Sequence, residues 1–113
     1  ICGIDFGFDH PTALVWLAFD RDEDIYYVYD CYRQSKSPPS VHAAQIKSRP
    51  NYIPISWPHD GNRRDSMGNP GLADQYRNLG CNMLKYLQPY LIGGRSSGCT
   101  IGKVVKLFLL GMI

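Results

Sequence analysis

Blocks of apolar residues separated by short polar segments fill the first third of the chain. Residues 2–6 form a short apolar run, which predicts a buried strand that leads into a turn. Residues 12–19 predict a second strand, and residues 25–32 predict a third that is dense in β-branched and aromatic side chains. The charged segment 20–24 between them predicts a solvated turn. We therefore expect an antiparallel meander of three strands.

A pair of prolines then stops the third strand, and the pattern becomes helical. Ser40 is expected to cap a helix over residues 41–48. The apolar side chains of Val41, Ala44 and Ile46 offer this helix a modest hydrophobic face. We expect that face to pack against the sheet.

The next segments alternate again between strand and helix. Residues 53–57 predict a short fourth strand that runs directly into Pro-His-Asp-Gly, which places Asp60 at the end of the strand. The polar segment 62–71 predicts a surface loop, and residues 72–79 predict a short helix that a glycine ends. Residues 81–84 are the candidate for a fifth strand.

The predicted order is three strands followed by alternating helices and strands. Such an order describes an α/β protein with a mixed sheet and helices on its faces, which is the ribonuclease H-like layout. Beyond Lys85 the pattern becomes indistinct. We therefore assign residues 1–84 to a ribonuclease H-like core and residues 85–113 to an unrecognised tail, interpreted as truncated or aberrant.

Composition narrows the class of protein. With 113 residues, 44% of them hydrophobic and 19% charged, the chain fits one compact domain and excludes a two-domain enzyme. The longest apolar stretch, residues 107–113, is far shorter than the about 18 residues of a membrane span, and no signal peptide opens the chain. We therefore expect a cytoplasmic protein without a membrane segment.

Four cysteines without Cys-x-x-Cys spacing predict reduced thiols, mostly in the core. The chain begins at Ile1, which we interpret as the start of a piece of a longer polypeptide.

Two aspartates carry the clearest chemical signal. Asp5 lies between Gly3 and Gly7, where small neighbours allow a backbone or a phosphate to approach, and Asp60 follows the predicted fourth strand. If the first and fourth strands are neighbours, the two carboxylates share a site that suits Mg²⁺ or Mn²⁺. Two such ions about 4 Å apart can activate a water and stabilise the leaving oxygen of a phosphodiester. The alternative is that each aspartate is an ordinary turn former.

Other polar residues near the two aspartates are further candidates. Asp9 is either a third metal ligand or part of an Asp-His-Pro turn. His59 is a candidate to orient a water or to contact a phosphate. Arg63 and Arg64 follow in the loop, where they either grip a DNA phosphate as fork-shaped donors or are merely solvated. The remaining histidines, both expected at the surface, are His10 and His42.

Three segments together, residues 3–13, 30–33 and 57–61, resemble the C-terminal nuclease domain of the large terminase subunit of tailed bacteriophages. The resemblance implies a ribonuclease H-like endonuclease that cuts concatemeric double-stranded DNA during genome packaging. It also implies that acidic residues bind two divalent ions, Mg²⁺ or Mn²⁺. Asp5 matches the family's first-strand acid, and Asp60 matches the acid after the fourth strand.

The same resemblance implies partners and one difference. The implied partners are an N-terminal packaging ATPase domain, a small terminase subunit and a portal protein, in the cytoplasm of a host bacterium. The family supplies a further acid near its C-terminus, whereas this chain has no carboxylate after Asp74. The alternative is therefore a catalytically incomplete prophage fragment that binds DNA weakly. A third interpretation takes Asp-Phe-Gly at residues 5–7 as the phosphate loop of a sugar kinase or actin-like ATPase, although those enzymes need two lobes.

Overall fold

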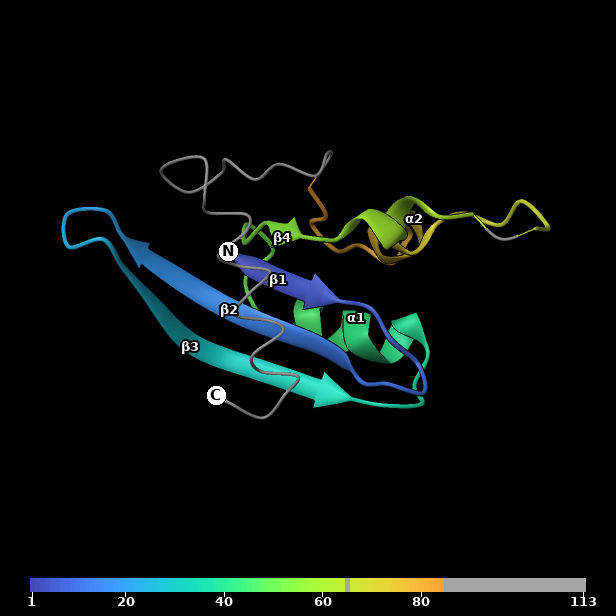
Figure 1. The fold of residues 1–113 in the computed structure, drawn as a ribbon, viewed down its shortest axis with the longest axis horizontal. Helices are drawn as coiled ribbons and strands as arrows, with labels where there is room; N and C mark the ends of the chain where they lie inside the picture. Colours follow the sequence, from blue (N-terminus) through green and yellow to red (C-terminus); the bar gives the residue numbers. More distant parts are fainter. Residues whose placement is uncertain (65, 85–113) are drawn as a thin grey trace.

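The computed structural model describes residues 1–64 and 66–84, in which four strands form one mixed sheet (Figure 1). Across the sheet the strands follow the order β3-β2-β1-β4. Their bounds are Cys2–Asp5 for β1, Thr12–Asp20 for β2, Ile25–Gln34 for β3 and Ile55–Ser56 for β4. The predicted α/β architecture with a mixed sheet is confirmed, whereas the predicted tail lies outside the described residues.

The first three strands form the predicted antiparallel meander. β2 pairs with β3 along its whole length, with one irregularity of register between Trp16 and Leu17. In the turn between these strands, the Asp20 carboxylate accepts the backbone N–H groups of Asp22 at 3.0 Å and of Glu23 at 3.2 Å. Such local hydrogen bonds explain why the charged segment forms a turn.

The fourth strand is parallel to β1 and shorter than the predicted strand over residues 53–57. Pro54 joins this pairing through its carbonyl alone, which accepts the N–H group of Cys2 at 3.0 Å, because proline has no N–H group to donate. A fifth strand over residues 81–84 was expected, but the described residues show an isolated parallel bridge between Ile55 and Met83 there instead.

Two α-helices follow the meander, α1 at Pro39–Lys47 and α2 at Leu72–Asn78. The prediction that Ser40 caps the first helix is wrong, because the helix already begins one residue earlier and no side chain caps it. A proline at the first helical position has no N–H group that needs a cap. Beyond α2, Gly80 adopts a positive φ of 94°, as expected of the glycine that ends a helix. No helix within residues 1–64 and 66–84 is long and apolar enough to cross a membrane.

Both helices contribute to the core on one face of the sheet. Cys2 and Ile4 alternate along β1 and share this face with Trp16 of β2. Burial raises the pKa of the Cys2 thiol to about 12, so the group stays protonated, in line with the expected role of core filler. The helix residues in the same core are Ala43, Ile46, Ala73 and Tyr76.

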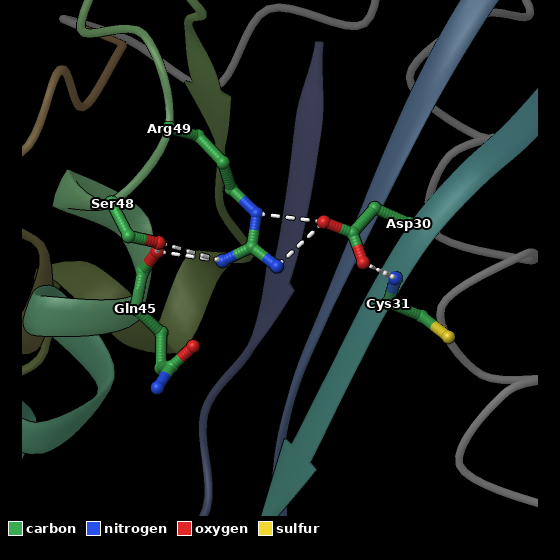
Figure 2. A network of polar contacts seen from close by, with 5 residues as sticks. All are labelled: Asp30, Cys31, Gln45, Ser48 and Arg49. Atoms are coloured by element: carbon green, nitrogen blue, oxygen red, sulfur yellow. Dashed lines mark hydrogen bonds and ion pairs between the residues drawn. The ribbon is translucent and has the colours of Figure 1, made fainter.

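Arg49, just beyond α1, ties that helix to the sheet (Figure 2). Its Nε and Nη2 atoms donate to Oδ2 of Asp30 on β3 at 2.8 and 2.6 Å, and Nη1 donates to the carbonyl of Gln45 at 2.6 Å. The guanidinium also lies 3.7 Å from the centre of the Trp16 ring. Oδ1 of Asp30 accepts the N–H group of Cys31 at 2.9 Å. The Asp30 carboxylate is therefore engaged in holding the fold together.

Candidate functional site

The parallel pairing of β1 and β4 brings two aspartates to the same edge of the sheet. Gly3 of β1 lies opposite Ser56 of β4, and parallel strands end on the same side. β1 ends at Asp5, and the chain beyond β4 reaches Asp60 in a 3-10 helix, η1, at His59–Asn62. The first and fourth strands are therefore neighbours, as a shared site of the two acids requires.

The prediction that Asp60 lies at the end of the fourth strand is wrong. β4 ends at Ser56, and Asp60 lies in the 3-10 turn that follows. The carbonyl of Pro58 accepts the N–H group of Gly61 at 3.0 Å and closes this turn. A Cβ atom at Gly61 would lie 2.5 Å from the ring of Trp57 and 3.0 Å from that of Phe6. The turn therefore packs on the core so closely that a side chain at this position would clash. This packing holds the exposed Asp60 side chain at the edge of the sheet.

The loop that leaves β1 carries the other acids. Asp5 is half-buried and, by strand alternation, faces away from the side of the sheet that Ile4 occupies. Asp9 is exposed within the loop. Thr12 closes the loop, because its hydroxyl donates to the carbonyl of Gly7 at 2.8 Å and accepts the N–H group of Gly7 at 3.1 Å. The structure thus places all three predicted acids at one edge, and whether they share a cation stays a prediction.

A cavity of about 320 Å³ lies beside Asp60, between the loop after β1, the start of α1 and α2. Figure 1 shows η1 and α2 side by side beyond the end of β4. Asp60 is exposed and also lines the cavity, so its side chain stands at the mouth. His42 and Tyr76, each 1% exposed, form the buried part of the wall. Burial raises the pKa of Tyr76, which keeps its hydroxyl protonated. Asp5 is not among the lining residues.

His42 was expected at the surface, and that prediction is wrong. The face that α1 turns to the core carries His42, Ala43 and Ile46, whereas the predicted face residues Val41 and Ala44 are exposed.

The contacts of the buried His42 ring bear on its charge. Its Nδ1 atom lies 3.1 Å from the hydroxyl oxygen of Tyr32 on β3. Burial lowers the pKa of the His42 imidazole, and a hydrogen bond with the backbone of Ser37 opposes part of this effect. The ring is therefore neutral at pH 7.

The remaining candidates lie next to Asp60. His59 is the first residue of η1. Arg63 and Arg64 follow η1 directly and are exposed, and the N–H group of Arg63 donates to the carbonyl of Asp60 at 3.1 Å. Two guanidinium groups beside a carboxylate that faces solvent are a suitable surface for a DNA phosphate.

The acids at this edge of the sheet can be compared with the ligands that a divalent ion needs. Carboxylate oxygens are the donors that Mg²⁺ and Mn²⁺ prefer. Asp5 and Asp60 carry two carboxylates at the same edge of the sheet. No group of three or more His, Cys, Asp or Glu side chains that could hold a metal ion occurs within residues 1–64 and 66–84. The donor type therefore fits a divalent ion, and further ligands are needed to complete the coordination.

Comparison with known sequences points in one direction. The model of a family described as "Terminase RNaseH-like domain" matches residues 2–87. The terminase large subunits of Enterobacteria phage LP7 and Salmonella phage P22 are each 34% identical to this chain over 107 residues, which are 95% of the chain and 22% and 21% of those proteins. The terminase large subunit of Escherichia phage T5 is 38% identical over 47 residues, 42% of this chain. The chain thus spans about a fifth of the length of the two longer matches.

Comparison with solved structures agrees with the comparison of sequences. The nuclease domain of the P22 large terminase superposes with a TM-score of 0.68 at 32% sequence identity. The match covers 100% of this chain and 58% of that domain. The four-stranded mixed sheet with two helices is therefore the ribonuclease H-like fold of that nuclease domain.

Proposed function

This chain belongs to the terminase RNaseH-like domain family, and from that membership we propose that it is the core of an endonuclease that cuts concatemeric double-stranded DNA during phage genome packaging. The single observation that carries the proposal is the parallel pairing of β1 with β4. This pairing brings the ends of the two strands, and with them Asp5 and Asp60, to one edge of the sheet. Two-metal hydrolysis of a phosphodiester needs the two carboxylates close enough there to share the ions, and that approach is part of the proposal.

In this proposal Asp5 and Asp60 bind Mg²⁺ or Mn²⁺, and Asp9 is a further candidate ligand in the adjoining loop. When bound, two such ions activate a water and stabilise the leaving oxygen of the phosphodiester. The chain's own residues place the DNA. Arg63 and Arg64 donate to backbone phosphates beside Asp60, and His59 contacts a phosphate or a water from the same turn.

Partners follow from the same proposal. A packaging ATPase domain precedes the nuclease in the polypeptide, and the complete subunit acts with a small terminase subunit and a portal protein in the cytoplasm of a host bacterium. The support for these partners is that the structural relative is a large terminase nuclease domain and that the sequence relatives are terminase large subunits. Family membership removes the support for the sugar kinase interpretation, which depended on the Asp-Phe-Gly segment alone.

A second function requires a test of its own, namely a prophage fragment that binds DNA weakly and does not cut it. Two observations favour it. The described residues hold no group of three potential metal ligands, and the sequence has no carboxylate after Asp74. Under this alternative, the two acids at the sheet edge bind a metal ion too weakly to support hydrolysis.

Nicking of supercoiled plasmid by the 113-residue chain in Mn²⁺ distinguishes the two functions. We expect metal-dependent nicking that Asp5→Asn and Asp60→Asn each reduce at least about a hundredfold, because each variant removes a carboxylate charge from the metal site. Asp22→Asn, in the exposed turn between β2 and β3, is the matched control and should nick like the natural chain. Absence of nicking together with retained gel-shift binding of DNA would favour the incomplete fragment, and equal nicking by all variants would contradict the nuclease proposal.

A further inference from the structure

The loop between β1 and β2 exposes an aromatic ring beside the candidate metal site. Phe8 is 60% exposed, and the next two residues along the loop, Asp9 and His10, are exposed as well. Phe8 also lines the cavity at whose mouth Asp60 stands. A molecule that enters this cavity therefore meets an aromatic side chain next to the acids of the site.

The backbone of this loop holds Phe8 in place. A Cβ atom at Gly7 would lie 2.4 Å from the carbonyl oxygen of His10, so the chain turns back on itself where only glycine fits. The carbonyl of Phe8 accepts the N–H group of Lys36 at 2.6 Å, which ties the loop to the segment after β3. The exposure of Phe8 is therefore a fixed feature of the fold.

The cavity wall continues this apolar surface. An exposed apolar residue needs no explanation by itself, but here further apolar side chains adjoin it. They are Phe6, Pro39 and Leu72. The hydroxyl groups of Thr12 and Ser37 in the same wall give their hydrogens to backbone carbonyl groups at 2.8 and 3.2 Å, so they do not donate into the cavity. At about 320 Å³, near the lower end of the about 300–1,000 Å³ of ligand pockets, the cavity suits one small flat ring system held by apolar contact.

Positive side chains flank the cavity on two sides. Lys36 is exposed and is bonded through its backbone to Phe8, and Arg63 and Arg64 are exposed on the side of Asp60. The acids between these cations are the proposed ligands of metal ions, which also attract phosphate. A nucleotide within a strand has the matching chemistry, because its base is flat and its backbone carries a phosphate on each side.

We propose that this cavity is a base subsite, in which Phe8 stacks on the nucleobase next to the scissile phosphate. This inference rests on the proposed function, because it takes the polymer bound at Asp5 and Asp60 to be DNA. Every base has a face that can stack, so the subsite is tolerant of sequence. Removing a base from an intact duplex costs about as much free energy as one stacking contact returns, so the subsite favours DNA that is unpaired at the cut.

Binding of a fluorescent single-stranded thymidine oligonucleotide tests the proposal without hydrolysis. Anisotropy titrations in EDTA measure the Kd while no strand is cut. We expect Phe8→Ala to raise the Kd about fivefold or more, which is the contribution of one stacked base, and Phe8→Trp to keep it within about twofold. The matched control is Tyr52→Ala, which removes an aromatic ring that is 82% exposed at the opposite end of β4 from Asp60, and it should leave the Kd unchanged.

Tryptophan fluorescence separates stacking on a base from contact with the DNA backbone, and it needs only the Phe8→Trp variant to fold. The new fluorophore should be quenched by the thymidine oligonucleotide and not by an oligomer of abasic deoxyribose phosphates. The natural chain, with buried Trp16 and Trp57, gives the background signal. Equal quenching by both oligomers, or no quenching by either, would overturn the proposal. So would a Phe8→Ala variant that melts at a lower temperature and binds the oligonucleotide like the natural chain, because Phe8 is then a packing residue.

The outcomes for the two proposals differ. If nicking depends on Asp60 while the Kd of the oligonucleotide does not depend on Phe8, the base subsite is wrong and the nuclease proposal stands. If the Kd depends on Phe8 and the natural chain does not nick, the nuclease proposal is wrong for this chain, and the base subsite stands as part of a fragment that binds DNA.

Discussion

The two halves of the sheet, β2 with β3 and β1 with β4, are stabilised in different ways. On one side β2 and β3 pair over strands of 9 and 10 residues, and Arg49 binds Asp30 while lying on the ring of Trp16. On the other side β4 has only 2 residues, and close packing of Gly61 on Trp57 holds the segment that follows it. Backbone hydrogen bonds dominate the first region, whereas side-chain packing dominates the second.

The difference separates a scaffold from a site. In a long hairpin the backbone N–H and C=O groups pair between the two strands. Few positions remain where a polar side chain is both fixed in place and exposed to solvent. A strand that ends early returns the chain to turns at the sheet edge, where a carboxylate such as that of Asp60 can be fixed and still reach solvent. Loss of the scaffold should therefore reduce stability, and changes at the edge should reduce chemistry first.

The largest expected effect on stability lies in the scaffold. Arg49→Leu removes both hydrogen bonds to Asp30 and the contact with Trp16, and we expect the free energy of unfolding to fall by about 2–3 kcal/mol. Arg49→Lys keeps the charge but not the fork, so its loss should be smaller. Urea unfolding followed by tryptophan fluorescence measures both. Arg21→Leu in the exposed turn is the matched control, and a loss there equal to that of Arg49→Leu would contradict the scaffold role.

The same contrast explains which parts of the fold the sequence could predict. Residues 12–19 and 25–32 were assigned to strands because long β-rich runs are a strong signal, and the structure confirms both. The predicted fourth strand is too long, because residues 53–57 are apolar almost throughout, whereas only Ile55 and Ser56 pair regularly with β1. Ser40 was assigned as a cap because serine favours that position, but Pro39 already starts the helix.

The site was predictable only in part, for a related reason. The sequence predicted a shared edge for Asp5 and Asp60 only on the condition that the first and fourth strands are neighbours, and the structure meets that condition. The burial of His42 could not be predicted, because a nine-residue helix carries two possible faces and the sequence favoured the one with Val41 and Ala44. The spacing of His42, Ala43 and Ile46 is the signal that could have shown the buried face.

A smaller loss is expected at the edge itself. Gly61→Ala would bring a Cβ atom to 2.5 Å from the Trp57 ring, so η1 must shift. We expect the free energy of unfolding to fall by about 1–2 kcal/mol and plasmid nicking to fall more than this loss of stability explains, because Asp60 moves with the turn. Asn62→Ala, an exposed neighbour in η1, is the control and should change neither quantity. Unchanged nicking by a folded Gly61→Ala variant would show that the position of η1 does not control activity.

Acid should weaken the fold through His42. Burial lowers the pKa of this group below its ordinary value of about 6.5, so between the two values the unfolded chain binds a proton that the folded chain does not. The contribution of His42 to the free energy of unfolding should therefore be constant above about pH 6.5 and fall below it, by at most about 1.4 kcal/mol per pH unit for one proton. Urea midpoints between pH 7.5 and 5.5 measure this slope. His42→Gln should flatten it and His10→Gln should not, and an equal slope in all three chains would contradict the assignment.

The smallest effect on stability, and the clearest on binding, is expected for the two exposed arginines beyond η1. Arg63→Gln and Arg64→Gln should change the free energy of unfolding by less than about 0.5 kcal/mol, because neither side chain is buried. Each should weaken DNA binding and reduce the slope of log K against log salt by about 0.9, the value for one lost phosphate contact. Fluorescence anisotropy with a short duplex at several salt concentrations measures this slope. Arg21→Gln, in the turn at the far end of the hairpin, has the same charge change and should leave the slope intact. If Arg21→Gln reduces the slope as much as Arg64→Gln does, DNA contacts the hairpin as well, and the division between scaffold and site is wrong.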